Sequence, residues 1–409
     1  MHSILTRNLF LYVAARSLVT VAVQIQSVAL SWFIYTQTGS AYALGFIGLA
    51  QFLPAIPTLT FAGYAADHFD RRKVLMTAQA IQAAALGLMA LTVHFTPETT
   101  VLIYGLVLLI GAARQAGNPS LIAMLPSAVP RDQYPRAIAI SSSAQKFAQV
   151  IGPMVGGFGY ALIGQDIFWF NPVLPLAALI AVLLMRMPKH DIEPRGDSSP
   201  MQRTLAGFSY IRSNRLLLGL LSLDLFAVLF GGVTALLPIF AHDVLHVGST
   251  GLGLLAAATP IGAVITGLSL AFFQLDRRAG PTMLIAIVGY GIAIVTFGLS
   301  TNFFLSLFAL VCSGACDITS TVIRQTIIQT TTPDAMRGRV SAVNMVFSGT
   351  SNQLGNFESG VVAGLIGAVP AAIVGGVGTL IVVAASLYVF PEIRRVNQIR
   401  SSRTSPAKV

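Results

Sequence analysis

The sequence predicts an all-α membrane protein whose twelve transmembrane helices form two pseudo-symmetric six-helix bundles. Composition is the first observation behind this prediction. Only 10% of the 409 residues are charged and 55% are hydrophobic, which is too little charge for a soluble domain of this length. The second observation is that twelve apolar stretches reach the length of about 20 residues that a helix needs to cross a bilayer. The third is the placement of positive charge.

Lysine and arginine are confined to alternate connections between the apolar stretches. Of the 25 such residues, 21 lie at the two termini or in turns two, four, six, eight and ten, and none lies in an odd-numbered turn. Because cytoplasmic loops carry the excess of Lys and Arg, both termini are expected in the cytoplasm, with the chain in a bacterial inner membrane. Contact with anionic membrane lipid accounts for the net charge of +10, so nucleic acid is not an expected partner.

The first bundle, residues 1–187, is predicted to hold six helices. The N-terminus lacks a small-residue cleavage site, so the first apolar stretch is expected to stay as a span. Short, nearly uncharged turns follow the first and third helices, and basic turns follow the second and fourth. Several stretches exceed 25 residues, which predicts tilt or extension beyond the hydrocarbon. The expected ranges are 8–36, 41–66, 73–95, 99–126, 134–163 and 168–187.

A polar segment, 188–212, divides the chain into near-equal halves. Its Pro- and Ser-rich start is typical of an irregular cytoplasmic linker. Its end carries Leu205, Phe208 and Ile211 at helical spacing, which predicts an interfacial helix on the cytoplasmic membrane face. The second bundle, 213–393, is followed by a basic cytoplasmic tail, 394–409. Its six helices are expected over 214–240, 250–275, 281–300, 303–330, 337–365 and 369–391.

The two halves look like copies of one six-helix unit. At an offset of 206 residues, the Asp-Arg-Arg triplet that begins at Asp70 recurs at Asp276. At an offset of 203 residues, Gly152 matches Gly355. Because each half crosses the membrane six times, the copies face the same way and are related by an axis along the membrane normal. This arrangement predicts a cavity between the halves that opens to one side at a time, and therefore transport.

The turn after the second predicted helix reads GYAADHFDRRKV. It resembles the signature Gly-x-x-x-Asp-Arg-x-Gly-Arg-Arg of the major facilitator superfamily, although His68 replaces a basic residue and Asp70 replaces the second glycine. The resemblance implies a latch on the cytoplasmic side of the transporter, and a simple positive-inside anchor is the alternative. The matching residues are Gly63, Asp67, Arg71 and Arg72.

The fifth predicted helix carries the sequence Gly-Pro-Met-Val-Gly-Gly. A proline beside a glycine loosens the backbone, and paired glycines let a neighbouring helix come close. The sequence is similar to the Gly-Pro-x-x-Gly-Gly motif that exporters and antiporters of the superfamily carry on this helix, and it favours efflux over uptake. The motif residues are Gly152, Pro153, Gly156 and Gly157.

Two further resemblances narrow the branch. On the fourth helix, Arg114 begins a partial match to the exporters' Arg-x-x-x-Gly signature, with Gly117 one residue early. The segments TGSAYALGFIGLAQFLPAIP and TTTPDAMRGRVSAVN look like the branch that contains bacterial enterobactin exporters and related secretion permeases. The resemblance covers essentially the whole chain.

Seven ionisable side chains lie inside the predicted spans. Each costs a few kcal/mol at bilayer depth unless it faces water or a partner, so each is a functional candidate. The resemblance places the first, fourth, seventh and tenth helices around the cavity, where the first half would present cations and the second half anions. The seven are Arg16, Arg114, Lys146, Asp224, Asp317, Arg324 and Glu358.

These charges are expected to pair in one state and part in another, which would tie protonation to opening. Asp317 is the first candidate for the proton carrier, followed by Asp224 and Glu358, and structural ion pairs are the alternative. Arginine suits an anionic or catecholate substrate, although Arg324 lies near the end of its helix and is expected to snorkel. The substrate-binding candidates, including polar amides, are Arg16, Gln24, Arg114, Asn118, Lys146, Arg324, Gln353 and Asn356.

The leading interpretation is a secondary active transporter that exports a small polar or anionic metabolite, such as a siderophore, in exchange for protons. It would work by alternating access as a functional monomer. A multidrug efflux transporter is the closest alternative, and an uptake permease or a metal carrier is a weaker one. No cofactor, metal or enzymatic activity is expected, because the histidines lie at ends or turns, Cys312 and Cys316 are too few for zinc, and no nucleotide-binding loop occurs.

Overall fold

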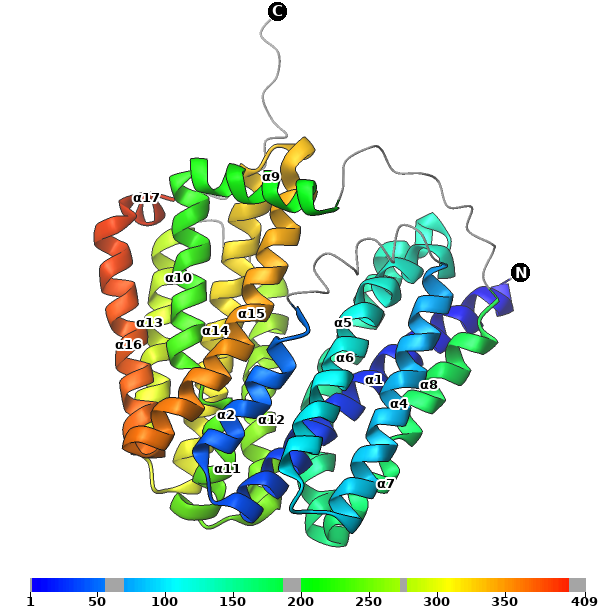
Figure 1. Ribbon diagram of the computed structural model, residues 1–409. Coiled ribbons are helices and arrows are strands. Elements are labelled where there is room, and N and C mark those ends of the chain that lie inside the picture. The colour runs from blue at the N-terminus through cyan, green and yellow to red at the C-terminus, as the bar shows by residue number, and fades with distance from the viewer. Residues whose placement is uncertain (1, 56–69, 187–199, 273–277, 397–409) are drawn as a thin grey trace, which may run out of the picture. The chain divides into compact units, whose positions relative to one another are not determined.

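A computed structural model describes residues 2–55, 70–186, 200–272 and 278–396 of the chain. Every regular element in these ranges is a helix (Figure 1). Nine of the described helices are long and apolar enough to cross a membrane, and Ala41–Phe52 and Val173–Leu184 are shorter apolar helices. A further helix, α15 (Asp334–Ile366), has 33 residues but is more polar, because Ser, Asn, Gln and Glu interrupt its apolar run. The prediction of an all-α, twelve-helix membrane protein is confirmed.

The chain forms two compact units, and each holds its own helices. Unit 1 comprises Met1–Pro200 and Ala235–Ala257, and unit 2 comprises Met201–Thr234 and Ala258–Val409. The bundle boundaries at 187 and 213 stay a prediction. The elements of unit 1 are α1 (His2–Thr38), α2 (Ala41–Phe52), α4 (Arg71–Phe95), α5 (Thr100–Ala128), η1 (Arg131–Gln133), α6 (Tyr134–Ile163), η2 (Gly164–Asp166), α7 (Ile167–Phe170), α8 (Val173–Leu184), α11 (Leu237–Ile239), η4 (Phe240–Val244) and the start of α12 (Gly248–Phe272).

In unit 2, α13 packs against α14 and α16, and α10 packs against α15 and α16. Its apolar core includes Leu217 and Leu220 of α10 together with Ile287, Ile323 and Val340 from three other helices. The remaining part of α12 also belongs to this unit. Its elements are α9 (Pro200–Ser213), α10 (Arg215–Gly231), α13 (Ala279–Leu299), α14 (Phe303–Thr331), α15 (Asp334–Ile366), α16 (Ala368–Val389) and α17 (Pro391–Arg394).

The end of the polar segment forms the helix α9, which crosses the ends of α10 and α15 (Figure 1). Ile211 is buried in the core of unit 2, and the ring of Phe208 stacks on Phe347 of α15 with a centroid distance of 6.5 Å. Leu205 and Phe208 remain largely exposed. One face of α9 therefore belongs to the protein, and contact of the other face with lipid stays a prediction.

Side-chain caps explain where several helices begin. Asn214 accepts hydrogen bonds from the backbone N–H groups of Leu216 and Leu217 at 3.1 and 3.2 Å at the start of α10. Asn302 caps α14 in the same way, and Asp70 accepts from the N–H of Arg72 at 2.9 Å at the start of α4. These oxygens satisfy N–H groups that have no partner inside the helix.

Two predicted helices are broken in the structure. The helix expected over 168–187 divides into α7 and α8 at Asn171 and Pro172, because proline has no N–H to donate and disfavours helix in the residue before it. The helix expected over 214–240 ends as α10 at Gly231, and Gly232 takes an extended conformation. The chain continues as the short elements η3 (Thr234–Leu236), α11 and η4. Two glycines followed by β-branched residues have low helix propensity, which permits this break.

Candidate functional site

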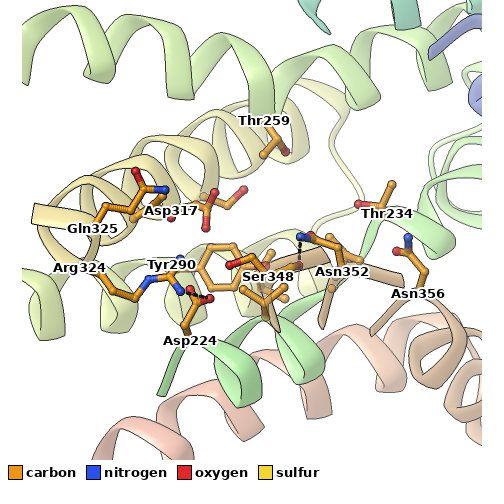
Figure 2. A pocket seen from close by; sticks show the side chains of 16 residues that line it. Asp224, Thr234, Thr259, Tyr290, Asp317, Arg324, Gln325, Ser348, Asn352 and Asn356 are labelled. Atoms are coloured by element: carbon orange, nitrogen blue, oxygen red, sulfur yellow. Dashed lines mark hydrogen bonds and ion pairs between the residues drawn. The ribbon is translucent and has the colours of Figure 1, made fainter. Parts of the chain in front are cut away.

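A polar cavity of about 300 Å³ lies within unit 2 (Figure 2). Helices α10, α12, α13, α14 and α15 supply its walls, and the break after α10 forms one side. Two carboxylates, one guanidinium, and several hydroxyl and amide groups face it. The lining residues are Asp224, Val228, Gly232, Val233, Thr234, Thr259, Tyr290, Ile294, Ser313, Asp317, Thr321, Arg324, Gln325, Ser348, Asn352 and Asn356.

Close helix contact positions one wall of the cavity. A Cβ atom on Gly262 of α12 would lie 1.9 Å from the carbonyl oxygen of Val311, and one on Gly314 of α14 would lie 2.0 Å from that of Thr259. Only glycine lets the two backbones approach so closely. The crossing places Thr259 and Asp317, which line the cavity, near the same contact.

A buried ion pair joins two walls of the cavity. Nη1 of Arg324 on α14 lies 2.5 Å from Oδ2 of Asp224 on α10, and the two side chains are only 5% and 11% exposed. The same Nη1 donates to the side-chain oxygen of Asn344 on α15 at 3.2 Å. Each charge would be costly here without the other. The expectation that Arg324 snorkels is therefore wrong, because a carboxylate from another helix holds its guanidinium inside the unit.

A second acid shares this cavity. Asp317 lies two helical turns before Arg324 on α14 and lines the same space, and Figure 2 shows its carboxyl group on the cavity wall opposite Asp224. One guanidinium thus serves a cavity with two carboxyl groups, and the formal charge of the three groups is −1 when both acids are ionised. Uptake of one proton would bring that charge to zero.

The structure brings four sequence-predicted candidates together in the cavity, namely Asp224, Asp317, Arg324 and Asn356. Two other candidates lie on α15 outside the lining. Oε2 of Glu358 lies 3.4 Å from the hydroxyl oxygen of Ser359. Oε1 of Gln353 is buried without a hydrogen-bond partner among the described residues.

Sequence reasoning missed the neutral part of the cavity. Tyr290, Thr234, Thr259 and Gln325 line it, yet none carries a charge that would mark it inside an apolar span. The signal for Thr234 was the Gly-Gly pair before it, which permits the break. For Tyr290, the only sequence signal is a hydroxyl group in the middle of an otherwise apolar helix.

Two first-half candidates bind α1 to α6 in unit 1. Nη1 of Arg16 donates to Oγ of Ser141 at 2.8 Å, and its Nη2 donates to Oε1 of Gln145. The side chain of Gln24 approaches the carbonyl oxygen of Gln149 at 3.5 Å. These contacts show both side chains in helix packing. Their predicted role in substrate binding stays a prediction.

The other first-half candidates make fewer contacts. Arg114 is half-buried on α5, and its guanidinium has no hydrogen bond or ion pair with the part of the chain that the structure describes. Asn118 and Lys146 are exposed. The predicted opposition of first-half cations and second-half anions stays a prediction, as does the assignment of these three residues to a substrate site.

The predicted latch is described only in part, because Gly63 and Asp67 lie outside the described residues. Nη1 of Arg71 donates to the carbonyl oxygen of Ala123 on α5 at 3.4 Å, and Nη2 of Arg72 donates to that of Leu183 on α8 at 2.7 Å. Carbonyls in the last turns of a helix carry partial negative charge and are natural partners for arginine. The two arginines thus tie the start of α4 to two neighbouring helix ends.

The glycine motif of α6 makes contacts on two sides. A Cβ on Gly152 would lie 2.5 Å from Cβ of Gln24, and one on Gly156 would lie 3.1 Å from Cα of Ile25, both on α1. On the other side, a Cβ on Gly157 would lie 2.7 Å from Cα of Gly253 on α12. Pro153 contributes its carbonyl oxygen to the same contact. The motif therefore allows backbone packing against two different helices.

The Gly157→Ala variant should be strongly disruptive for so small a change. The added methyl group would lie 2.4 Å from the carbonyl oxygen of Ser249, and overpacking of this kind costs about 1–3 kcal/mol. Thermal unfolding in detergent would measure the loss. Gly105→Ala on α5 is the matched control, because its methyl group would meet nothing within 4 Å. Equal melting temperatures of the two variants would contradict the packing role.

A polar cluster also joins the end of α1 to η4 within unit 1. The hydroxyl of Tyr35 donates to Oδ2 of Asp243, and Nδ1 of His242 lies 2.5 Å from Oδ1 of the same carboxylate. The rings of Trp32 and Tyr35 lie 5.6 and 5.7 Å from that of His242. The sequence indicated only a polar turn here, because the partners lie more than 200 residues apart.

Comparison with known proteins places the chain among transporters. The profile of the transmembrane secretion effector family matches residues 3–409. The enterobactin exporter EntS of Citrobacter koseri is 30% identical over 387 residues, which cover 93% of this chain and 89% of that protein. The enterobactin exporter EntS of Escherichia coli strain SMS-3-5 is 29% identical over 394 residues, covering 95% of this chain and 90% of that protein.

Solved structures of transporters share the fold. The crystal structure of the nucleoside transporter NupG superposes with a TM-score of 0.75 at 13% identity, covering 95% of this chain and 99% of that chain. A bacterial homologue of the human lysosomal transporter Spinster, inward-facing and occupied, gives a TM-score of 0.71 at 15% identity, covering 98% of this chain and 99% of that one. At these identities the likeness concerns the fold alone.

Proposed function

Because this chain belongs to the transmembrane secretion effector family of the major facilitator superfamily, we propose that it exports a small polar or anionic metabolite, such as a siderophore, in exchange for protons. The chain is a multi-pass membrane transporter and not an enzyme. In the proposal it works by alternating access as a monomer in a bacterial inner membrane. Both termini would then lie in the cytoplasm, as the distribution of Lys and Arg predicts.

The observation that carries the proton coupling is the charged cavity of unit 2. Ionisable groups within membrane spans are costly and are typical of proton and substrate pathways. Here Asp224 and Asp317 share a cavity with a single arginine, Arg324. A proton on either acid would cancel the net charge of the three groups. In the proposal, Asp317 carries the exchanged proton and Asp224 keeps Arg324 in place.

Export and an anionic substrate are supported by different features. The relatives at about 30% identity are named as enterobactin exporters, and the glycine motif of α6 is similar to that of exporters and antiporters. Arg16, Arg114 and Lys146 give unit 1 three cations at membrane depth, and guanidinium groups suit catecholate or carboxylate oxygens. These side chains are the proposed anion-binding groups.

Transport into inverted membrane vesicles tests the proposal, with enterobactin as the probe. A pH gradient with an acidic lumen should drive enterobactin into vesicles that contain the protein, and a protonophore should abolish the accumulation. Vesicles without the protein are the control. Accumulation of lipophilic cations in place of enterobactin would favour a multidrug transporter instead. Enterobactin that leaves the vesicles under the same gradient would favour an uptake permease.

A further inference from the structure

Tyr290 lies where two features of unit 2 meet. One is the end of α10 at the break in the seventh span, and the other is the pair of carboxyl groups in the polar cavity. Its side chain reaches from α13, which is otherwise an apolar helix of the unit, and it lines the cavity. Figure 2 shows its ring among Asp224, Asp317 and Arg324.

The break leaves backbone carbonyl groups that α10 itself cannot satisfy. The hydroxyl of Tyr290 donates to the carbonyl oxygen of Gly231 at 2.8 Å. The hydroxyl of Ser359 on α15 donates to that of Gly232. The hydroxyl of Thr379 on α16 lies 3.1 Å from the carbonyl oxygens of both Ala227 and Gly375. Three hydroxyl groups from three helices thus contact carbonyl groups near the end of α10 inside the unit, where water is scarce.

Of the three hydroxyl groups, that of Tyr290 shares the cavity with Asp224 and Asp317, whereas that of Ser359 lies 3.4 Å from Oε2 of Glu358. Neither Ser359 nor Thr379 lines the cavity, whereas Tyr290 does. Asp224 and Asp317 line the same cavity as Tyr290 (Figure 2). The ring is also held against the break, because a Cβ atom on Gly231 would lie 2.3 Å from its Cε1 atom. Tyr290 is therefore in contact with the break at the end of α10, and it lines the cavity that holds the two acids.

We propose that Tyr290 is a positioning residue that couples the charge of the cavity to the break at the end of α10, in the seventh span. A phenol has a single O–H donor, so it can hold either the Gly231 carbonyl or a carboxylate. A hydrogen bond to an ionised carboxylate is about twice as strong as one between neutral groups. Asp224 is held by Arg324, so the exchange falls to Asp317. A protonated Asp317 leaves the hydroxyl on Gly231, as the structure has it, and an ionised Asp317 draws it away and loosens the end of α10.

The surrounding groups are consistent with this exchange of partners. The charged or titratable groups near the hydroxyl are Asp224 on α10 and Asp317 and Arg324 on α14, and the thiol of Cys316 packs against Gly289 beside it. The cavity-lining residues of α15 carry only hydroxyl and amide groups. Because Asp224 is paired with Arg324, a change of pH acts on this hydroxyl through Asp317.

The inference deepens the proposed proton exchange and rests on it, but it can be tested without a substrate. Hydrogen exchange is measured by mass spectrometry on the full-length protein in lipid nanodiscs at about pH 6 and about pH 8, and rates are corrected for the intrinsic effect of pH. In the unmodified protein, amides at 231–236 should exchange about fivefold faster at the higher pH, the factor that corresponds to one ordinary hydrogen bond.

Three variants separate coupling from simple stability. Tyr290→Phe keeps the ring but removes the donor, so the ratio of corrected rates should fall to about one. Thr379→Val removes a hydroxyl group that contacts α10 but does not line the cavity. It should therefore keep the ratio of exchange rates between the two pH values, even if α10 loosens overall. Asp317→Asn keeps Tyr290 but removes an ionising group, and it should lose most of the ratio.

The outcomes are distinct. A pH-dependent ratio that persists in Tyr290→Phe would overturn the inference, and so would an equal loss in Thr379→Val or a ratio of one in the unmodified protein. If Tyr290→Phe fails to fold, the comparison of Asp317→Asn with Thr379→Val decides, because only Asp317→Asn should lose the pH-dependent ratio. Failure of vesicles to accumulate enterobactin, with the exchange pattern intact, would count against the proposed substrate and direction but not against the coupling.

Discussion

The Asp317→Asn variant is expected to lose pH-gradient-driven transport while it keeps enterobactin binding. The amide retains the size and hydrogen-bonding capacity of the carboxyl group, but it cannot bind or release a proton. Transport driven by the gradient should fall by about 5- to 150-fold, the range of typical coupling free energies. Inverted vesicles measure the driven flux, and equilibrium binding of enterobactin to the purified protein measures the affinity.

Asp334→Asn is the matched control for this variant. Asp334 begins α15, and its side chain is 86% exposed in an ion pair with Arg337, so it should contribute little to stability or transport. Full gradient-driven transport by Asp317→Asn would show that another acid carries the proton. Asp224 in the same cavity and Glu358 on α15 would then be the acids to test.

Replacement of Arg324 by alanine should be among the most destabilising substitutions in unit 2. It would leave the carboxylate of Asp224 buried without its partner, since the two side chains are 11% and 5% exposed. Removal of one member of a buried ion pair costs about 3–5 kcal/mol. A large drop in melting temperature in detergent is therefore expected, together with loss of transport.

A second substitution distinguishes charge from packing in this pair. The double variant Asp224→Asn, Arg324→Gln removes both charges and should recover much of the lost stability, because neither member of the pair is left charged without its partner. Arg215→Ala breaks the exposed pair with Glu392 and should cost about 0–1 kcal/mol. If Arg324→Ala were as mild as Arg215→Ala, the buried pair would have no structural importance.

Helix positions were predictable from the sequence because hydrophobic length and charge placement are properties of each segment alone. The range 134–163 matches α6, and 281–300 differs from α13 by two residues at the start and one at the end. The breaks were not predicted. The run of apolar residues from Leu216 to Phe240 continues through Gly231 and Gly232, so hydropathy alone gives no sign that the helix ends there.

Pairing between helices was harder to predict than the helices themselves. The sequence marked Asp224 and Arg324 as costly charges in separate spans, but their contact depends on how α10 and α14 pack a hundred residues apart. The position of Arg324 near the end of its helix suggested that its side chain would snorkel. Instead, the ion pair with Asp224 on α10 holds the guanidinium inside the unit. Tyr290 was missed for a related reason, because its importance comes from the carbonyl it caps and the acids it faces.

Proton movement coupled to enterobactin transport tests the central claim most directly. The purified protein is reconstituted in liposomes that contain a pH-sensitive dye, with no imposed gradient, and enterobactin is added outside. Entry of enterobactin should drive protons out of the liposomes and raise the internal pH, and Asp317→Asn should show no such change. Enterobactin entry with unchanged internal pH in the unmodified protein would contradict proton-coupled export.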